Sequence, residues 1–85
     1  MKWEEIRMHY PMQWLLVEAL EAHTEAAERI IEDMAVIESF EDSQQALQGY
    51  ANLHRTHPQR ELYVLHTTRD ALTITERYRL APRTR

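Results

Sequence analysis

Two histidines stand at a spacing that suits metal binding. His54 and His57 lie three residues apart, which places their side chains on one face of a helix. Such a pair can hold zinc, nickel or copper if His9, His23 or His66 supplies a third ligand. Because the chain has no cysteine and no HExxH motif, we interpret the pair as polar groups that complement the end of a helix dipole. We expect no cofactor or metal, and a small metal-binding protein or enzyme that uses His54, His57 and His66 is the alternative.

A second group of reactive side chains occupies residues 66–70, with the sequence His-Thr-Thr-Arg-Asp. In principle Asp70 can orient His66, which then activates a threonine hydroxyl. However, glycine is absent from this region, and the motifs of a nucleophile elbow or an oxyanion hole are missing. We therefore expect no enzyme activity, and we expect a threonine of this segment to form a hydrogen bond within a turn.

The charged residues are unevenly distributed along a chain whose net charge is −4. Residues 18–42 hold nine carboxylates and one arginine, whereas residues 55–85 hold seven arginines and three carboxylates. The acidic segment would repel a polyanion. Nucleic-acid binding is therefore not expected, and a nucleic-acid-associated factor is the second alternative, with these C-terminal residues as phosphate contacts: Arg77, Arg79, Arg83 and Arg85.

Large aromatic residues are the strongest indication of a binding function. Seven of them are more than a small domain readily encloses, and aromatic side chains are enriched at protein interfaces. We predict a homodimer, formed by edge strands or by facing sheets, that acts as a partner-binding or regulatory accessory. The candidate interaction residues are Trp3, Tyr10, Trp14, Phe40, Tyr50 and Tyr63.

The length of 85 residues predicts a single domain, 1–85, with a thin stability margin. No apolar run is longer than that of residues 14–17, which is far short of the roughly 20 residues that cross a bilayer. No export signal is apparent at the start of the chain. We therefore expect a soluble, cytoplasmic protein with no membrane association.

Two helices are predicted from capping and periodicity. A short N-terminal helix carries Trp3 and Ile6 on one face and should end at Tyr10, which precedes a proline. The main helix begins after Asp42, a capping residue, and is ended by Pro58. Gly49, the only glycine, lies inside this helix, which predicts a close approach to a sheet or to a second subunit.

Strands are predicted on both sides of the main helix. Residues 62–66 and 72–78 are rich in β-branched and aromatic side chains. The stretch between Gln13 and Phe40 fits either strands at 14–22 and 30–40, joined by a turn at 23–29, or one long helix. We favour the hairpin, because one isolated strand pair would be marginal. The predicted fold is α+β and two-layered, with an antiparallel sheet in β-β-α-β(-β) order and a short N-terminal helix; a mostly α fold is the alternative.

Several of these residues form a pattern that resembles a group of small uncharacterised bacterial proteins. The pattern comprises Tyr10-Pro11-x-x-Trp14, Arg29-Ile-Ile, Phe40-x-Asp42, Ala46, Tyr50, Leu53-His54, Pro58-x-Arg60-Glu61-Leu62-Tyr63 and His66-Thr67. The resemblance implies a small β-β-α-β fold in a bacterial cytoplasm. It implies no known activity and no catalytic residue. Members of the group tend to carry glycine or asparagine near the turn that is 25–28 here.

Overall fold

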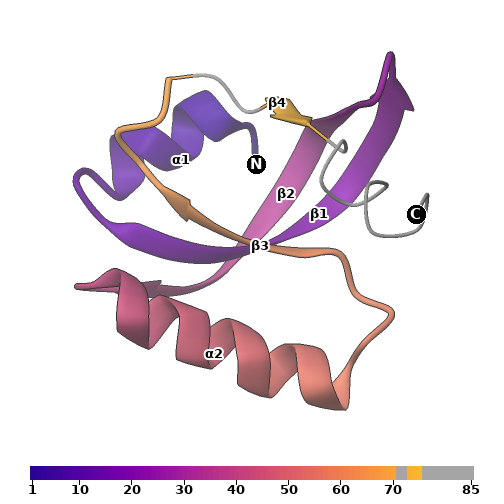
Figure 1. Cartoon of the computed structure of the whole chain (residues 1–85). Coiled ribbons are helices and arrows are strands. Elements are labelled where there is room, and N and C mark those ends of the chain that lie inside the picture. The colour runs from indigo at the N-terminus through magenta and orange to yellow at the C-terminus, as the bar shows by residue number, and fades with distance from the viewer. Residues whose placement is uncertain (71–72, 76–85) are drawn as a thin grey trace.

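The computed structural model describes residues 1–70 and 73–75 of the chain as a four-stranded antiparallel sheet with two helices. The elements follow the order α1 (Trp3–His9), β1 (Trp14–Glu25), β2 (Glu28–Phe40), α2 (Ser43–Thr56), β3 (Leu62–His66) and β4 (Thr73–Thr75). The strands lie in the order β3-β1-β2-β4 (Figure 1). The predicted α+β fold with β-β-α-β order is confirmed, and the mostly α alternative is wrong.

The hairpin of β1 and β2 dominates the sheet and turns at two alanines. Ala26 and Ala27 adopt φ values of 50° and 65°, the left-handed conformation that a two-residue turn of the tightest hairpin type requires. The strands therefore continue to Glu25 and from Glu28, further than predicted. Sequence reasoning ended them early because alanine does not favour this conformation.

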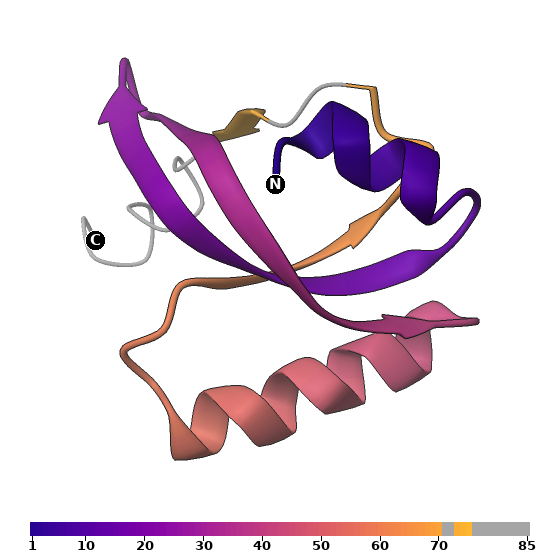
Figure 2. The same cartoon turned by 180° about the vertical axis from the view of Figure 1, so that it is seen from behind.

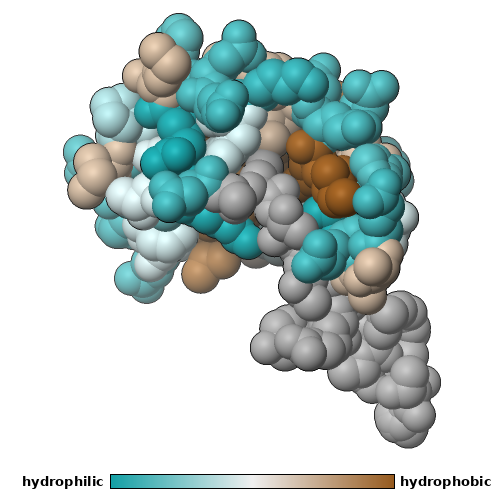
Figure 3. Space-filling view, turned by 90° about the horizontal axis from the view of Figure 1, so that it is seen from above, coloured by the Kyte–Doolittle hydropathy of each residue, from teal (hydrophilic) through white to brown (hydrophobic). Residues whose placement is uncertain are grey.

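One face of the sheet packs against α1 (Figures 1 and 2). Trp3 and Ile6 are buried in a core cluster with Leu15, Val17 and Met34. The Trp3 indole N–H donates to the Arg69 carbonyl oxygen at 2.8 Å, so the segment after β3 is tied across the helix. Seen from above (Figure 3), most described surface residues are hydrophilic, and one strongly hydrophobic group is visible on the right of the view.

The opposite face of the sheet carries α2 (Figures 1 and 2), so the sheet is the middle of three layers and not one of the two predicted. The Asp42 carboxylate accepts a hydrogen bond from the Gln45 backbone N–H at 2.8 Å, which confirms the predicted cap. Ala46 is fully buried, and Gly49 lies directly against the ring of Phe40. The close approach predicted from this glycine is therefore made to the sheet.

The two edges of the sheet differ. On the β2 side, β4 pairs with residues 28–30, and the Met1 carbonyl accepts from the Met34 N–H at 3.0 Å. On the other side, β3 is the outermost strand within the described part of the chain. Of the strand expected at 72–78, residues 73–75 are extended, while 72 and 76–78 lie outside the described residues. Within the described ranges, no helix is long and apolar enough to cross a membrane.

Candidate functional site

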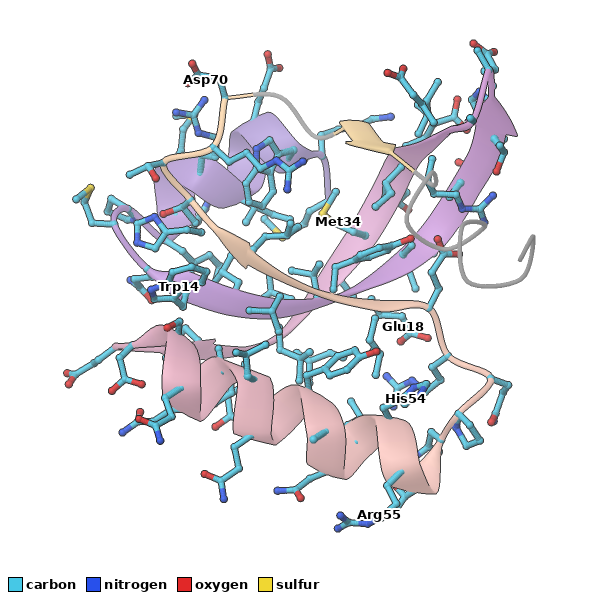
Figure 4. All side chains as sticks on the ribbon, in the orientation of Figure 1. Trp14, Glu18, Met34, His54, Arg55 and Asp70 are labelled. Carbon is cyan, nitrogen blue, oxygen red and sulfur yellow. The ribbon has the colours of Figure 1, made fainter. Side chains whose placement is uncertain are left out.

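An open groove of about 810 Å³ lies between α2 and β3. The loop that joins these two elements forms its end wall, through residues 58–61. In Figure 4, His54 points from α2 toward the sheet, below Glu18 of β1, whereas Arg55 points away from it. The apolar and aromatic walls of the groove consist of Leu47, Tyr50, His54, Leu62, Tyr63 and Val64.

The helical wall of the groove is a stripe of three side chains spaced by three and four residues. Leu47 lines the groove and is 56% exposed, so much of its apolar side chain is in contact with solvent. Tyr50 and His54 stack nearly parallel, with ring centroids 5.4 Å apart and an angle of 8° between the planes. This stripe places two stacked aromatic rings beside an exposed aliphatic side chain.

An ion pair and a tyrosine hold the start of β3 against the hairpin. The Arg29 guanidinium donates to both Glu61 carboxylate oxygens at 2.8 Å, in the two-point geometry that is strongest for this pair. The Tyr63 hydroxyl donates to the same carboxylate at 2.6 Å. Because these side chains are only partly exposed, they set the position of the loop and of the first residues of β3.

A second ion pair joins the same loop to β1. The Arg60 guanidinium lies 2.6 Å from the Glu18 carboxylate. This hydrogen bond, together with the charge of Arg60, holds the pKa of Glu18 below its ordinary value despite the opposing effect of desolvation. The same hydrogen bond raises the pKa of Arg60. Arg29, Arg60 and Glu61 thus line the end of the groove with their charges paired, Arg60 to Glu18 of β1.

The backbone of β3 presents hydrogen-bonding groups at the sheet edge. The Ala19 N–H donates to the Glu61 carbonyl, and the Thr67 N–H donates to the Gln13 carbonyl. The backbone N–H and C=O groups of the odd-numbered residues of this segment therefore point toward β1. In an antiparallel strand, alternate residues direct their backbone groups to opposite sides. It follows that Leu62, Val64 and His66 direct theirs away from β1, where the described residues place no further strand.

The side chains of β3 include none of the residue types that commonly prevent further strand pairing at a sheet edge. None of its five residues, LYVLH, is a proline, an aspartate, a glutamate, a lysine or an arginine, although proteins commonly place such residues on exposed edges to prevent pairing. Figure 1 is drawn from this side, and β3 crosses in front of the other strands. The groove and the open edge are therefore adjacent parts of one surface.

No protein-family model, no curated protein and no solved structure matches this chain.

His66 lies far from the other two histidines considered as metal ligands. His54 is beside the Leu62 end of β3, whereas His66 is at the other end, roughly 13 Å along the strand, with its ring 4.9 Å from that of Trp14. His57 Nδ1 lies 2.9 Å from the Thr56 hydroxyl. Among the described residues, no three histidine, aspartate or glutamate side chains are placed to hold a metal ion.

The catalytic arrangement considered for residues 66–70, in which Asp70 orients His66, is not observed. The Asp70 carboxylate pairs with the Arg7 guanidinium at 3.2 Å, whereas His66 Nδ1 lies 2.8 Å from the Thr68 hydroxyl. Asp70 therefore does not orient His66. The expected hydrogen bond of a threonine within this turn is confirmed.

The six aromatic residues predicted to take part in interactions lie in different surroundings. Tyr50 and Tyr63 line the groove. Trp14 and Phe40 are half-buried at the far end of the sheet face that carries α2, whereas Tyr10 packs against the core cluster on the other side. Trp3 is enclosed, with only 7% of its surface exposed.

Three features of the site were not predicted from the sequence, namely Leu47, Val64 and the two ion pairs. Leu47 and Val64 left a detectable signal, since the 47-50-54 spacing forms a second helical stripe and β3 lacks any charge. The ion pairs did not, because Arg29 with Glu61 and Glu18 with Arg60 are 32 and 42 residues apart. A single sequence contains no information on such pairing.

Proposed function

We propose that this chain is a non-catalytic protein-binding domain of the bacterial cytoplasm that acts as a homodimer, and that it binds an extended protein segment along β3. The observation that carries the proposal is the edge of β3 immediately beside the groove, on which residues 1–70 and 73–75 place no further strand. Such an edge can receive one more strand, in the recognition mode known as strand addition.

The groove provides the sequence preference that backbone hydrogen bonds alone do not give. An added strand gains affinity from hydrogen bonds to the backbone of Leu62, Val64 and His66, which are the same for every sequence. Its alternate side chains point to the α2 side of the sheet, where Leu47 and Tyr50 can contact them. We therefore expect a preference for segments with apolar residues at every second position.

The alternatives have weaker support. A metal-binding protein or enzyme would need His54, His57 and His66 to act together, and His66 lies at the opposite end of β3 from His54. The arginines that would contact a nucleic acid, Arg77, Arg79, Arg83 and Arg85, lie outside the described residues. The two arginines at the end of the groove, Arg29 and Arg60, are each paired with a carboxylate.

The test is a selection of displayed random peptides on protein immobilised at low density, so that the immobilised copies do not contact one another. We expect enrichment of peptides with alternating apolar residues. Chemical assembly of the chain with an N-methyl group on Val64 removes one outward hydrogen-bond donor and keeps the side chain. We expect peptide affinity to fall by about tenfold or more, since one backbone hydrogen bond and close strand contact are lost.

Two results would contradict the proposal. The first is a selection that enriches no peptide above background. The second is a set of peptides whose affinities for the N-methylated and unmodified chains are equal, with circular dichroism confirming that both are folded. The first result would show that the chain binds no such peptide, and the second would show that the peptides bind elsewhere than along β3.

A further inference from the structure

The outer edge of β3, which no other strand of the described residues pairs with, is self-complementary. If two copies of β3 run antiparallel with Val64 at the centre, Val64 faces Val64 of the second copy, and Leu62 faces His66. This register puts the outward backbone groups of both strands opposite each other. It brings no like charges together, because β3 carries no acidic or basic residue other than His66.

The direction of α2 relative to β3 also favours a second copy of the chain as the partner. The C-terminal end of α2 lies at the Leu62 end of β3, where His54 and Leu62 line one groove. Its N-terminal end lies at the His66 end, because Phe40 pairs with Trp14, which in turn pairs with His66. A two-fold axis through Val64, perpendicular to the sheet, therefore places the two α2 helices antiparallel on one face.

Charges on these helices are then complementary across the axis. The N-terminal end of α2 is preceded by Glu41 and Asp42, and its last turn contains His54 and Arg55. All four residues are exposed. In the antiparallel arrangement the acidic end of each helix lies beside the basic end of the other, an arrangement that the helix dipoles also favour.

We propose that the partner that occupies β3 is a second copy of this chain, paired antiparallel about Val64 to give one continuous sheet across two molecules. The inference rests on the proposed function, since it names the segment that the edge receives. Leu47 and Tyr50 of the two copies then face each other over the joined strands. Leu47, which is exposed in one copy, is then covered by the other copy. The dimer thereby buries more apolar surface than one small copy can bury alone.

Single cysteines test the register directly, because the chain has no cysteine of its own. In the proposed dimer the two Cα atoms at position 64 lie about 5.5 Å apart, within the range of a disulfide. The Val64→Cys variant should therefore form a disulfide-linked dimer on mild oxidation. His66→Cys alone should not, because its counterpart lies four residues along the strand, whereas a mixture of Leu62→Cys and His66→Cys should yield the mixed dimer.

Charge reversal tests the helix arrangement independently. Glu41→Arg and Arg55→Glu should each weaken dimerisation by about tenfold in sedimentation dilution series, and the double variant should recover most of the loss because the pairs are reversed together. Glu21→Arg, a matched reversal on β1, should have little effect. The wild-type dimer should also weaken as salt is raised.

The outcomes separate this inference from the proposed function. A chain that stays monomeric into the high micromolar range, or a dimer in which His66→Cys cross-links with itself and Val64→Cys does not, overturns the inference. If such a chain still binds displayed peptides in a manner sensitive to N-methylation of Val64, the proposed function stands with a foreign partner. If Val64→Cys fails to fold, the Leu62→Cys and His66→Cys mixture decides the register.

Discussion

Gly49 on α2 lies against the ring of Phe40 at the end of β2, so closely that a Cβ atom at position 49 would lie 2.8 Å from Cζ of that ring. Real Cβ contacts are longer than this, so the two residues fix how closely the helix approaches the sheet. The position of α2 in turn determines the width of the groove beside β3. A glycine that lowers helix propensity thus permits this close packing.

Gly49→Ala should not deliver the stabilisation that helix propensity alone predicts, about 1 kcal/mol. The new methyl group must displace the Phe40 ring, which costs a similar or greater amount. In a Phe40→Leu background the methyl group has room, so Gly49→Ala should then stabilise the chain. Urea unfolding of the four variants measures the coupling, and equal effects of Gly49→Ala in both backgrounds would contradict the contact.

Ala27→Gly should stabilise the hairpin. Ala27 has φ of 65°, where glycine carries no steric cost and an alanine costs about 1 kcal/mol. The expected gain of up to about 1 kcal/mol corresponds to an increase in Tm of roughly 4–8 °C for a domain of this size. Glycine at Ala51, an exposed position within α2, is the matched control and should lower Tm. A lower Tm for both variants would mean that the turn is not left-handed at position 27.

Glu61→Gln should destabilise the chain by about 1–2 kcal/mol, because it replaces the partner of a two-point arginine contact at a half-buried site. The same change loosens the start of β3, so peptide affinity and dimerisation should fall with stability. Glu38→Gln, a change at an exposed carboxylate on β2, serves as the control and should have little effect. A Glu61→Gln variant as stable as wild type would show that the Arg29 contact does not hold the loop.

The Glu18–Arg60 pair should make part of the stability pH-dependent. Because the pKa of Glu18 is lowered in the folded chain, the carboxylate contributes stability that is complete above the ordinary glutamate pKa of about 4.3. This contribution is lost as the pH falls through the lower, folded-state pKa. The stability difference between wild type and Glu18→Gln should therefore be constant from pH 6 to 8 and shrink below about pH 4.

Thermal unfolding across this pH range measures the difference, and Glu21→Gln on the same strand is the control. A difference between wild type and Glu18→Gln that does not change between pH 7 and pH 3 would contradict the assignment. Because Glu18 and Arg60 are partly exposed, added salt should reduce the effect.

The elements of this fold were largely predictable, because each left a local signal. Asp42 before the helix, Pro58 after it and the alternating residues of β3 are readable from neighbouring positions alone. The hairpin was harder, since Ala26 and Ala27 form a turn that their sequence does not indicate, and only the strand character on either side favoured it. Local rules succeed where the chain obeys local preferences and fail where tertiary contacts override them.

The site was less predictable for the same reason. Tyr50 and Tyr63 were selected as aromatic residues, but nothing local shows that they line one groove. The grouping of His54 with His66 followed from residue type, and the structure separates them along β3. Which edge of the sheet stays open depends on the strand order, a property of the whole fold that no segment contains.

Amide hydrogen exchange along β3 tests the central claim, that its outward edge is the binding element, most directly. At the lowest workable concentration the Tyr63 and Leu65 amides, which face β1, should exchange slowly, and the Val64 amide should exchange fast despite lying between them. As the concentration rises, or as a selected peptide is added, the Val64 amide should become protected. A Val64 amide that exchanges at one unchanging rate under all these conditions would contradict the account.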